Sequence, residues 1–191
     1  VMTDFQNPDG AFPDFANDVY MHYNYVKPPV HGWALSRLMR AAPAFYDRKR
    51  TASAFGTLER WTEFWLKRQA WDADSLPHYL HGNDSGWDNS TVFLRGAPVV
   101  SPDLAAFLVI QCDVLSDLAV KLGKKSAAAS WKKRADGLLD RLFATLWDGG
   151  RFFALKLPER DRIVTDSLLL AMPVVLGKRL PEKVRGPLVK Q

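Results

Sequence analysis

At 191 residues the chain is long enough for one domain with a substantial core, and its 47% of hydrophobic residues excludes a disordered protein. The net charge of +5 is modest, and Lys and Arg alternate with acids along helix-like segments, which indicates solvated helix faces and excludes a nucleic-acid groove. A single cysteine, Cys112, excludes an internal disulfide and a cysteine-based metal site, and the lack of any apolar run of roughly 18 residues excludes a membrane span.

The first part of the chain predicts a turn followed by two helices. Residues 6–10 have strong turn chemistry, with Asn, Pro, Asp and Gly in succession. The pair Pro28-Pro29 then opens an apolar periodic segment that predicts a helix over residues 30–46, because proline is tolerated in a first helical turn. A second helix is predicted over residues 53–68, with one apolar stripe formed by Phe55, Leu58, Trp61, Phe64 and Trp65.

The middle of the chain predicts a loop between helices. Residues 81–90 are too polar and too interrupted by glycine for a helix or a buried strand. Ser101 as N-cap and Pro102 at the first helical position then predict a helix that continues to about Leu122. The next helix is predicted over residues 126–146, with a buried stripe formed by Trp131, Ala135, Leu138, Leu139 and Leu142.

The last part of the chain predicts a hairpin and two short helices. Residues 148–150 make a tight turn, so residues 151–157 are predicted to form a short hairpin arm. A helix is predicted over residues 166–176, ending at Gly177, and another over residues 181–189.

The predicted helices alternate in character between apolar on nearly all sides and amphipathic with a charged face. The apolar kind, expected to be buried, covers residues 30–46, 101–122 and 166–176, and the amphipathic kind covers residues 53–68, 126–146 and 181–190. Alternating inner and outer helices predict an all-α fold, a partial (α/α)6 toroid of about three inner/outer helical hairpins, in preference to an ordinary bundle. We assign residues 1–191 to one incomplete domain, and expect the exposed apolar faces of its end hairpins to be covered by missing segments or another chain.

The loop at residues 81–90 has the strongest functional signal, because it holds two acids, two amides, a histidine and an indole. A Trp beside an Asp suits sugar chemistry, since the indole offers a flat apolar face to a pyranose ring and the carboxyl can exchange a proton with the glycosidic oxygen. One alternative is an Asx-rich turn that caps the next helix. Another is a site for a hard cation, although the loop lacks the regular acidic spacing of a dedicated calcium loop.

Four stretches of this sequence resemble the trehalase-like glycoside hydrolases built on an (α/α)6 barrel, and most closely glycoside hydrolase family 63 and the bacterial mannosylglycerate hydrolase-like group. They are residues 6–13, 27–34, 81–90 and 101–104. The Ser-Gly-Trp-Asp core at residues 85–88 is the most specific, because trehalases share it. The resemblance implies an inverting hydrolase of α-linked glucosyl or mannosyl substrates, with a small carbohydrate as partner and no cofactor or metal.

The same resemblance implies that Asp88 is the general acid. From the residues themselves, Trp87 and Trp33 are expected to shield this carboxyl from water and help it to hold a proton near neutral pH. Asp84 is the competing acid, and it is better suited to brace the loop by accepting backbone N–H groups.

The resemblance further implies that a set of side chains lines the sugar pocket together with Trp87: Asn89, Asn83, His81, His31 and Trp33. His31 can instead cap or brace the start of its helix, and Trp33 can be ordinary core. Gln111, a polar residue in an inner helix, either reaches the pocket or bonds a neighbouring backbone, since a buried amide needs a partner.

The chain departs from the family where the second carboxyl should be. An inverting glycosidase needs two carboxyl groups ~6.5–9.5 Å apart, and the resemblance places the base far downstream of the acid. None of the four glutamates is expected to face the pocket: Glu59 and Glu63 on an outer helix, Glu159 in a charged turn and Glu182 in the terminal segment. The family's upstream Trp-Asp segment is absent, and the sequence begins at Val1, so we expect an inactive fragment, of cytoplasmic or periplasmic origin.

The alternative function is a non-catalytic carbohydrate-binding or scaffold protein derived from the same fold. Both functions predict sugar binding, but only the enzyme requires a carboxylate opposite Asp88 in the full-length protein. A helical-repeat interaction domain is the weakest hypothesis, because it would not need a Trp-Asp loop.

Overall fold

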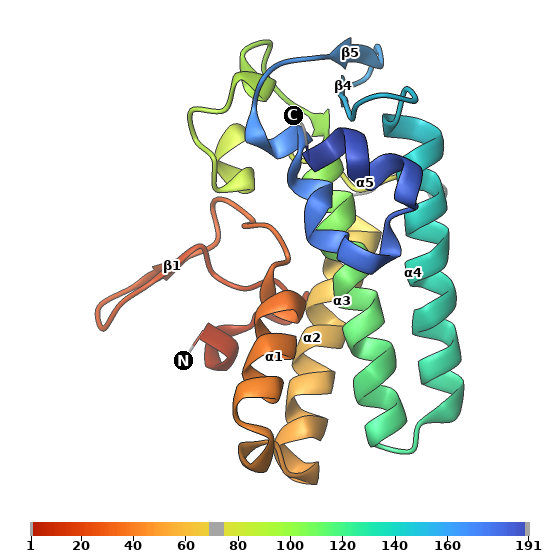
Figure 1. The fold of residues 1–191 in the computed structure, drawn as a ribbon. Helices are drawn as coiled ribbons and strands as arrows, with labels where there is room; N and C mark the ends of the chain where they lie inside the picture. Colours follow the sequence, from red (N-terminus) through yellow and green to blue (C-terminus); the bar gives the residue numbers. More distant parts are fainter. Residues whose placement is uncertain (1, 69–74, 190–191) are drawn as a thin grey trace.

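The computed structural model describes residues 2–68 and 75–189. These residues form helical hairpins with a small sheet at one end and a separate pair of short strands at the side (Figure 1). The hairpins are α1 (His31–Ala41) with α2 (Arg48–Arg68), α3 (Pro102–Lys121) with α4 (Lys125–Leu146), and the 3-10 helix η6 (Met172–Arg179) with α5 (Glu182–Val189). The inner elements α1 and η6 both contact α3. This arrangement confirms the predicted partial toroid of about three inner/outer hairpins.

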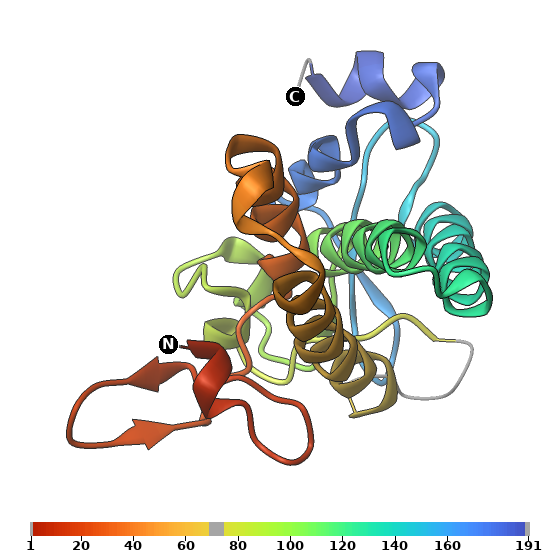
Figure 2. The ribbon, with the colours of Figure 1, turned by 90° about the horizontal axis from the view of Figure 1, so that it is seen from below.

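Helix α3 lies at the centre of the fold. Nearly every side chain from Pro102 to Ala119 is buried, because α1, α2, α4 and η6 all pack against this helix. Figure 2 looks nearly along α3 and shows α1 and α2 on one side of it and α4 on the other. The predicted inner helix over residues 101–122 is therefore confirmed.

The predicted helix over residues 30–46 is shorter and more exposed than expected. It ends at Ala41, and a separate 3-10 helix η2 (Pro43–Phe45) follows. The break lies at Ala42, whose backbone is non-helical because the ring of the following proline disfavours the α conformation there. Gly32 is the only fully buried residue of α1, whereas Trp33 and Leu38 are exposed, so the prediction of burial on all sides is wrong here.

Helix α2 begins at Arg48, ahead of the predicted start at residue 53. The Arg-Lys-Arg run at its start has no apolar periodicity, which is why the pattern missed this turn. The turn is stabilised by Asp47, whose side-chain oxygen accepts the backbone N–H of Arg50 at 2.8 Å.

The predicted α-helix over residues 166–176 is wrong in type. Two 3-10 helices stand in its place, η5 (Leu168–Leu170) and η6. Pro173 has no N–H to continue an α-helical ladder, and its ring disfavours the α conformation of the residue before it. Gly177, with φ of 53° and ψ of −116°, then breaks the segment where the sequence predicted its end.

A small antiparallel sheet covers one end of the helices (Figure 1). Its strands are β3 (Val99–Val100), β4 (Ala154–Lys156) and β5 (Asp161–Ile163), in the order β3-β4-β5. The predicted hairpin arm at residues 151–157 is confirmed by the pairing of β4 with β5, whereas β3 was not predicted. The hairpin of β1 (Phe15–Ala16) and β2 (Met21–His22) was not predicted either. Among the described helices, none has the length and apolarity that crossing a bilayer requires.

Helices α1 and α3 approach each other closely at Gly32. A Cβ atom at this position would lie 2.8 Å from the Cα of Gln111, closer than side-chain carbons pack in proteins. The backbone N–H of Gly32 also donates to Oε1 of Gln111 at 3.0 Å. The absence of a side chain on Gly32 therefore lets the two inner helices meet.

Gly32→Ala is expected to lower the free energy of unfolding by about 1–3 kcal/mol, because overpacking forces the helices apart. Gly56→Ala in α2 is the matched control, since the nearest atom to its added Cβ is the flexible Arg60 Nη1 at 3.9 Å. This control should be neutral or stabilising by up to about 1 kcal/mol. Urea unfolding followed by circular dichroism measures both, and a Gly32→Ala protein as stable as the control would contradict the close approach.

Candidate functional site

The polar loop after residue 80 folds around the 3-10 helix η3 (Gly82–Ser85). His81 is its N-cap, and its Nδ1 accepts the backbone N–H of Asn83 at 3.1 Å. Gly86 ends the helix with a φ of 72°, a left-handed conformation that suits glycine. The chain then turns outward into Trp87 and Asp88, which are both exposed.

Asp84 holds this loop in place. Its carboxylate accepts three backbone N–H groups, from Leu80 and His81 at 2.9 Å each and from Val26 at 3.1 Å. Burial raises the pKa of Asp84, and these three bonds oppose the rise. The expectation that Asp84 braces the loop by accepting backbone N–H groups is confirmed.

Asp88 lies in an open pocket with a volume of about 810 Å³. One wall is formed by the segment that contains Trp87, Asp88 and Asn89, and the other wall by residues 165–168. Trp87 is 42% exposed, so part of its indole face is free to contact a ligand. Of the predicted site residues, these three are brought together.

The His81 ring and the backbone of Asn83 contact residues 25–27. The His81 ring contacts the Tyr25 ring with centroids 4.9 Å apart. Lys27 Nζ donates to the backbone carbonyl of Asn83 at 2.6 Å. Neither residue lines the Asp88 pocket.

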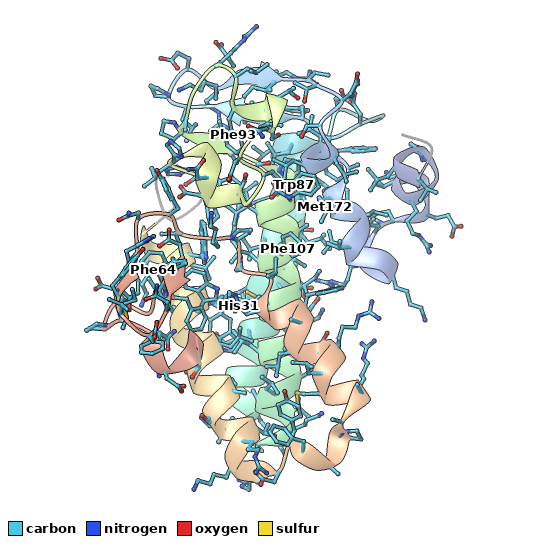
Figure 3. All side chains as sticks on the ribbon, turned by 90° about the vertical axis from the view of Figure 1, so that its left-hand side faces the viewer. His31, Phe64, Trp87, Phe93, Phe107 and Met172 are labelled. Atoms are coloured by element: carbon cyan, nitrogen blue, oxygen red, sulfur yellow. The ribbon has the colours of Figure 1, made fainter. Side chains whose placement is uncertain are left out.

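His31, at the start of α1, lies well below Trp87 along the length of α3, as Figure 3 shows. The His31 ring packs on Phe12 and Trp61, with centroids 4.6 and 5.6 Å apart. Burial lowers the pKa of His31 to about 4, so its imidazole is neutral at physiological pH. Its side chain does not cap α1, and Val30 occupies the N-cap position.

Trp33 and Gln111 also lie outside the Asp88 pocket. Trp33 is 41% exposed on α1 and does not line the pocket around Asp88, so the shielding of that carboxyl by Trp33 stays a prediction. Gln111 is fully buried and bonded at both ends, accepting from the Gly32 backbone and donating to Thr62 Oγ1 at 3.0 Å. Of its two predicted roles, the structure shows the bond to a neighbouring backbone.

The second wall of the pocket was missed by the sequence analysis. It contributes Thr165, Asp166, Ser167 and Leu168, which precede and begin η5. Ser167 caps this helix in the same way that Ser90 caps η4 (Thr91–Phe93) on the opposite wall. A serine N-cap before a short apolar run was the available signal, but it does not reveal that the two segments meet.

A buried carboxyl, Asp103, lies at the start of α3 and was also missed. Tyr79 OH donates to its Oδ2 at 2.7 Å, and Ser101 Oγ donates to its Oδ1. Burial raises the pKa of Asp103 to about 6, although both hydroxyl donors favour the charged form. Tyr79 directly precedes the polar loop, so this cluster ties the loop to α3. Across residues 2–68 and 75–189, no three His, Cys, Asp or Glu side chains gather as metal ligands.

Comparisons with known proteins agree with this fold. The whole chain, residues 1–191, matches the family described as the mannosylglycerate hydrolase MGH1-like glycoside hydrolase domain. Among curated proteins, none matches the chain.

Three solved structures from Thermus thermophilus are similar. A GH63 mannosylglycerate hydrolase in complex with Tris and D-glycerate has 18% identity to this chain and a TM-score of 0.78. The match covers 100% of this chain and 62% of the hydrolase chain. The glucose complex of a GH63 mannosylglycerate hydrolase has 22% identity and a TM-score of 0.78, covering 100% and 61%. An uncharacterized conserved protein has 20% identity and a TM-score of 0.79, covering 99% and 60%. The chain thus spans about 60% of the length of these structures, and at these identities the likeness shows the fold.

The pH dependence of stability is expected to report on Asp103. Because its pKa in the folded chain, about 6, exceeds the ordinary value of 3.8, the folded state binds this proton more tightly than the unfolded state. Asp103 therefore contributes its full stabilisation at pH values below its ordinary pKa. This contribution to the free energy of unfolding, roughly 2–3 kcal/mol, is lost as the pH rises through about 6. Urea unfolding at a series of pH values should show this loss, and Asp103→Asn should abolish it.

Asp140→Asn, an exposed carboxyl on α4, is the control and should leave the pH profile unchanged. If Asp103→Asn and the wild-type chain showed the same pH dependence of unfolding free energy, the assignment of that dependence to Asp103 would be contradicted.

Proposed function

The chain belongs to the MGH1-like glycoside hydrolase family, and from this premise we propose that it is the acid-bearing part of an inverting glycoside hydrolase. The substrates we propose are α-linked glucosyl or mannosyl compounds. Asp88 protonates the glycosidic oxygen while a second carboxylate activates a water molecule on the opposite face of the sugar. The surroundings of Asp88 support this role. Its carboxyl is exposed beside the partly exposed indole of Trp87, in a pocket large enough for a sugar ring.

Trp87 and Asn89 are the residues to which we assign direct sugar contact. The indole of Trp87 offers an apolar face to the ring, and the amide of Asn89 can both donate to and accept from hydroxyl groups. His81, Asn83, His31, Trp33 and Gln111 do not line the Asp88 pocket, and His31 lies lower than Trp87 in Figure 3. We therefore assign them positioning roles in the loop and helices.

The base is proposed to come from outside the described residues. Glu59 accepts from Trp131 Nε1 at 3.2 Å, and Glu63 pairs with Lys67 at 3.3 Å and with Arg134, so both serve the outer helices. Glu182 pairs with Arg185 in α5, and Glu159 is exposed in the turn between β4 and β5. None of these glutamates lines the Asp88 pocket in the described part of the chain.

The exposed apolar faces of the end hairpins fit this proposal. Trp33 and Leu38 on α1 and Leu168 and Val174 near η6 are all exposed. Single surface apolar side chains are common, but these lie on the two hairpins that flank the central one. We propose that further helices, from missing segments or another chain, cover them.

The 191-residue chain alone is expected not to hydrolyse mannosylglycerate or α-glucosides above the uncatalysed rate, because the acid acts without its base. Product release from the purified chain over several days measures this. Turnover by the purified chain that disappears in Asp88→Asn would contradict the proposal.

In a longer protein that contains this chain and its base, Asp88→Asn is expected to lower kcat by about 10²–10⁴-fold on substrates with alcohol leaving groups. An α-glycosyl fluoride needs no proton on its leaving group, so the same variant should retain most of its activity on the fluoride. Initial-rate assays with both substrates make this comparison. Equal losses on the two substrates would show that Asp88 is not the acid, and unchanged activity on both would favour the carbohydrate-binding alternative for this segment.

A further inference from the structure

The Asp88 pocket has two walls that come from distant parts of the sequence. One wall consists of residues 87–91 and Leu94, and the other of residues 165–168. The walls are joined directly, since Ser90 Oγ and Ser167 Oγ lie 2.7 Å apart and share a hydrogen bond. Each serine also accepts a backbone N–H of its own 3-10 helix, from Val92 and Leu169 respectively.

A separate apolar cluster fixes the two walls from beneath. Its buried members come from the 3-10 helices η4 and η5, which are continuous with the two walls, and from the small sheet: Val92, Val99, Ala154, Ile163, Leu169 and Leu170. Burial of apolar side chains that both walls share makes their spacing part of the folded structure. The two walls therefore form one preorganised unit.

Asp166 presents an exposed carboxylate on the second wall, with one long ion pair to Arg151. Its side chain is fully exposed, and among the described residues no hydrogen bond to it is found. The nearest cation, Arg151, lies 3.9 Å away and already donates to the Thr165 carbonyl at 3.1 Å. The carboxylates of Asp84 and Asp103, by contrast, accept hydrogen bonds from donors inside the protein.

We propose that Asp166 is a specificity residue of this pocket, binding hydroxyl groups of a neutral pyranose ring from the wall opposite Asp88. This inference rests on the proposed function. The two oxygens of a carboxylate accept hydrogen bonds from neighbouring sugar hydroxyls, and such charge-assisted bonds are about twice as strong as neutral ones.

The charge of the pocket sets the class of ligand. Its lining contains two carboxylates and neither Lys nor Arg, so it disfavours an anionic group by like-charge repulsion. Trp87, Leu94 and Leu168 add exposed apolar surface to the same lining, which suits the C–H faces of a sugar ring. The pocket therefore selects an uncharged ring, and a carboxylated group of a substrate is bound elsewhere.

The test is a titration of the 191-residue chain with methyl α-D-mannopyranoside or D-glucose, followed by amide chemical shifts in NMR. The unchanged chain should bind one of the two sugars and should not bind D-glycerate in this pocket. Asp166→Ala should weaken the binding by at least about tenfold, because hydrogen bonds to a charged acceptor are lost. Asp161→Ala, an exposed acid on β5 outside the pocket, is the matched control and should bind as the unchanged chain does.

Sugar binding that is equal in Asp166→Ala and in the control would overturn this inference and leave the proposed role of Asp88 intact. Absence of binding to the unchanged chain, or binding of D-glycerate at the shifts of residues 87–91 and 165–168, would overturn it as well. The role of Asp88 is decided separately, by the comparison of leaving groups in the longer protein. Matching amide spectra of the free proteins show that each variant is folded.

Discussion

The fold depends on the burial of α3. Most of its side chains are apolar and buried, so water must be excluded from most of its surface, and one flanking helix cannot achieve this. Helices α1, α2, α4 and η6 each cover a part of it, and the hairpin connections follow from that arrangement. The amphipathic helices then turn their charged faces outward, where Lys67, Lys132 and Arg134 pair with nearby acids. The polar loop and the small sheet rest on the end of this central helix.

Buried polar groups fix the geometry that apolar packing leaves free. An apolar core tolerates small shifts of one helix along another, but a buried amide or carboxyl left without a partner costs free energy, so its bonds set the register. Gln111 links α3 to α1 and α2 in this way. Asp103 does the same at the start of α3, where Tyr79 and Ser101 donate to it. Through Tyr79 this second cluster reaches the polar loop, so the position of the candidate site is tied to the core.

Local signals in the sequence predicted the parts of the fold that local forces decide. Ser101 and Pro102 marked the start of α3, the alternation of helix types predicted the partial toroid, and the acid inside the polar loop was expected to brace it. The errors lie where neighbouring segments decide the outcome. Periodicity over residues 30–46 and 166–176 concealed the breaks before Pro43 and Pro173. The second wall of the pocket could not be predicted, because the contact between Ser90 and Ser167 joins residues 77 positions apart.

Asp84, Asp88, Asp103 and Asp166 differ in what they can do because they differ in their hydrogen-bond donors. A general acid must exchange its proton with a substrate, so its oxygens have to be reachable and uncommitted. Asp84 lies inside a turn where three backbone N–H groups converge, and Asp103 is enclosed with two hydroxyls, so neither meets the condition. Asp88 follows the left-handed Gly86, which turns the chain out of that ring of donors only four residues after Asp84. The backbone conformation of one glycine thus separates the acid that holds the loop from the acid that can face a sugar, and the Ser90–Ser167 contact places Asp166 in the same pocket.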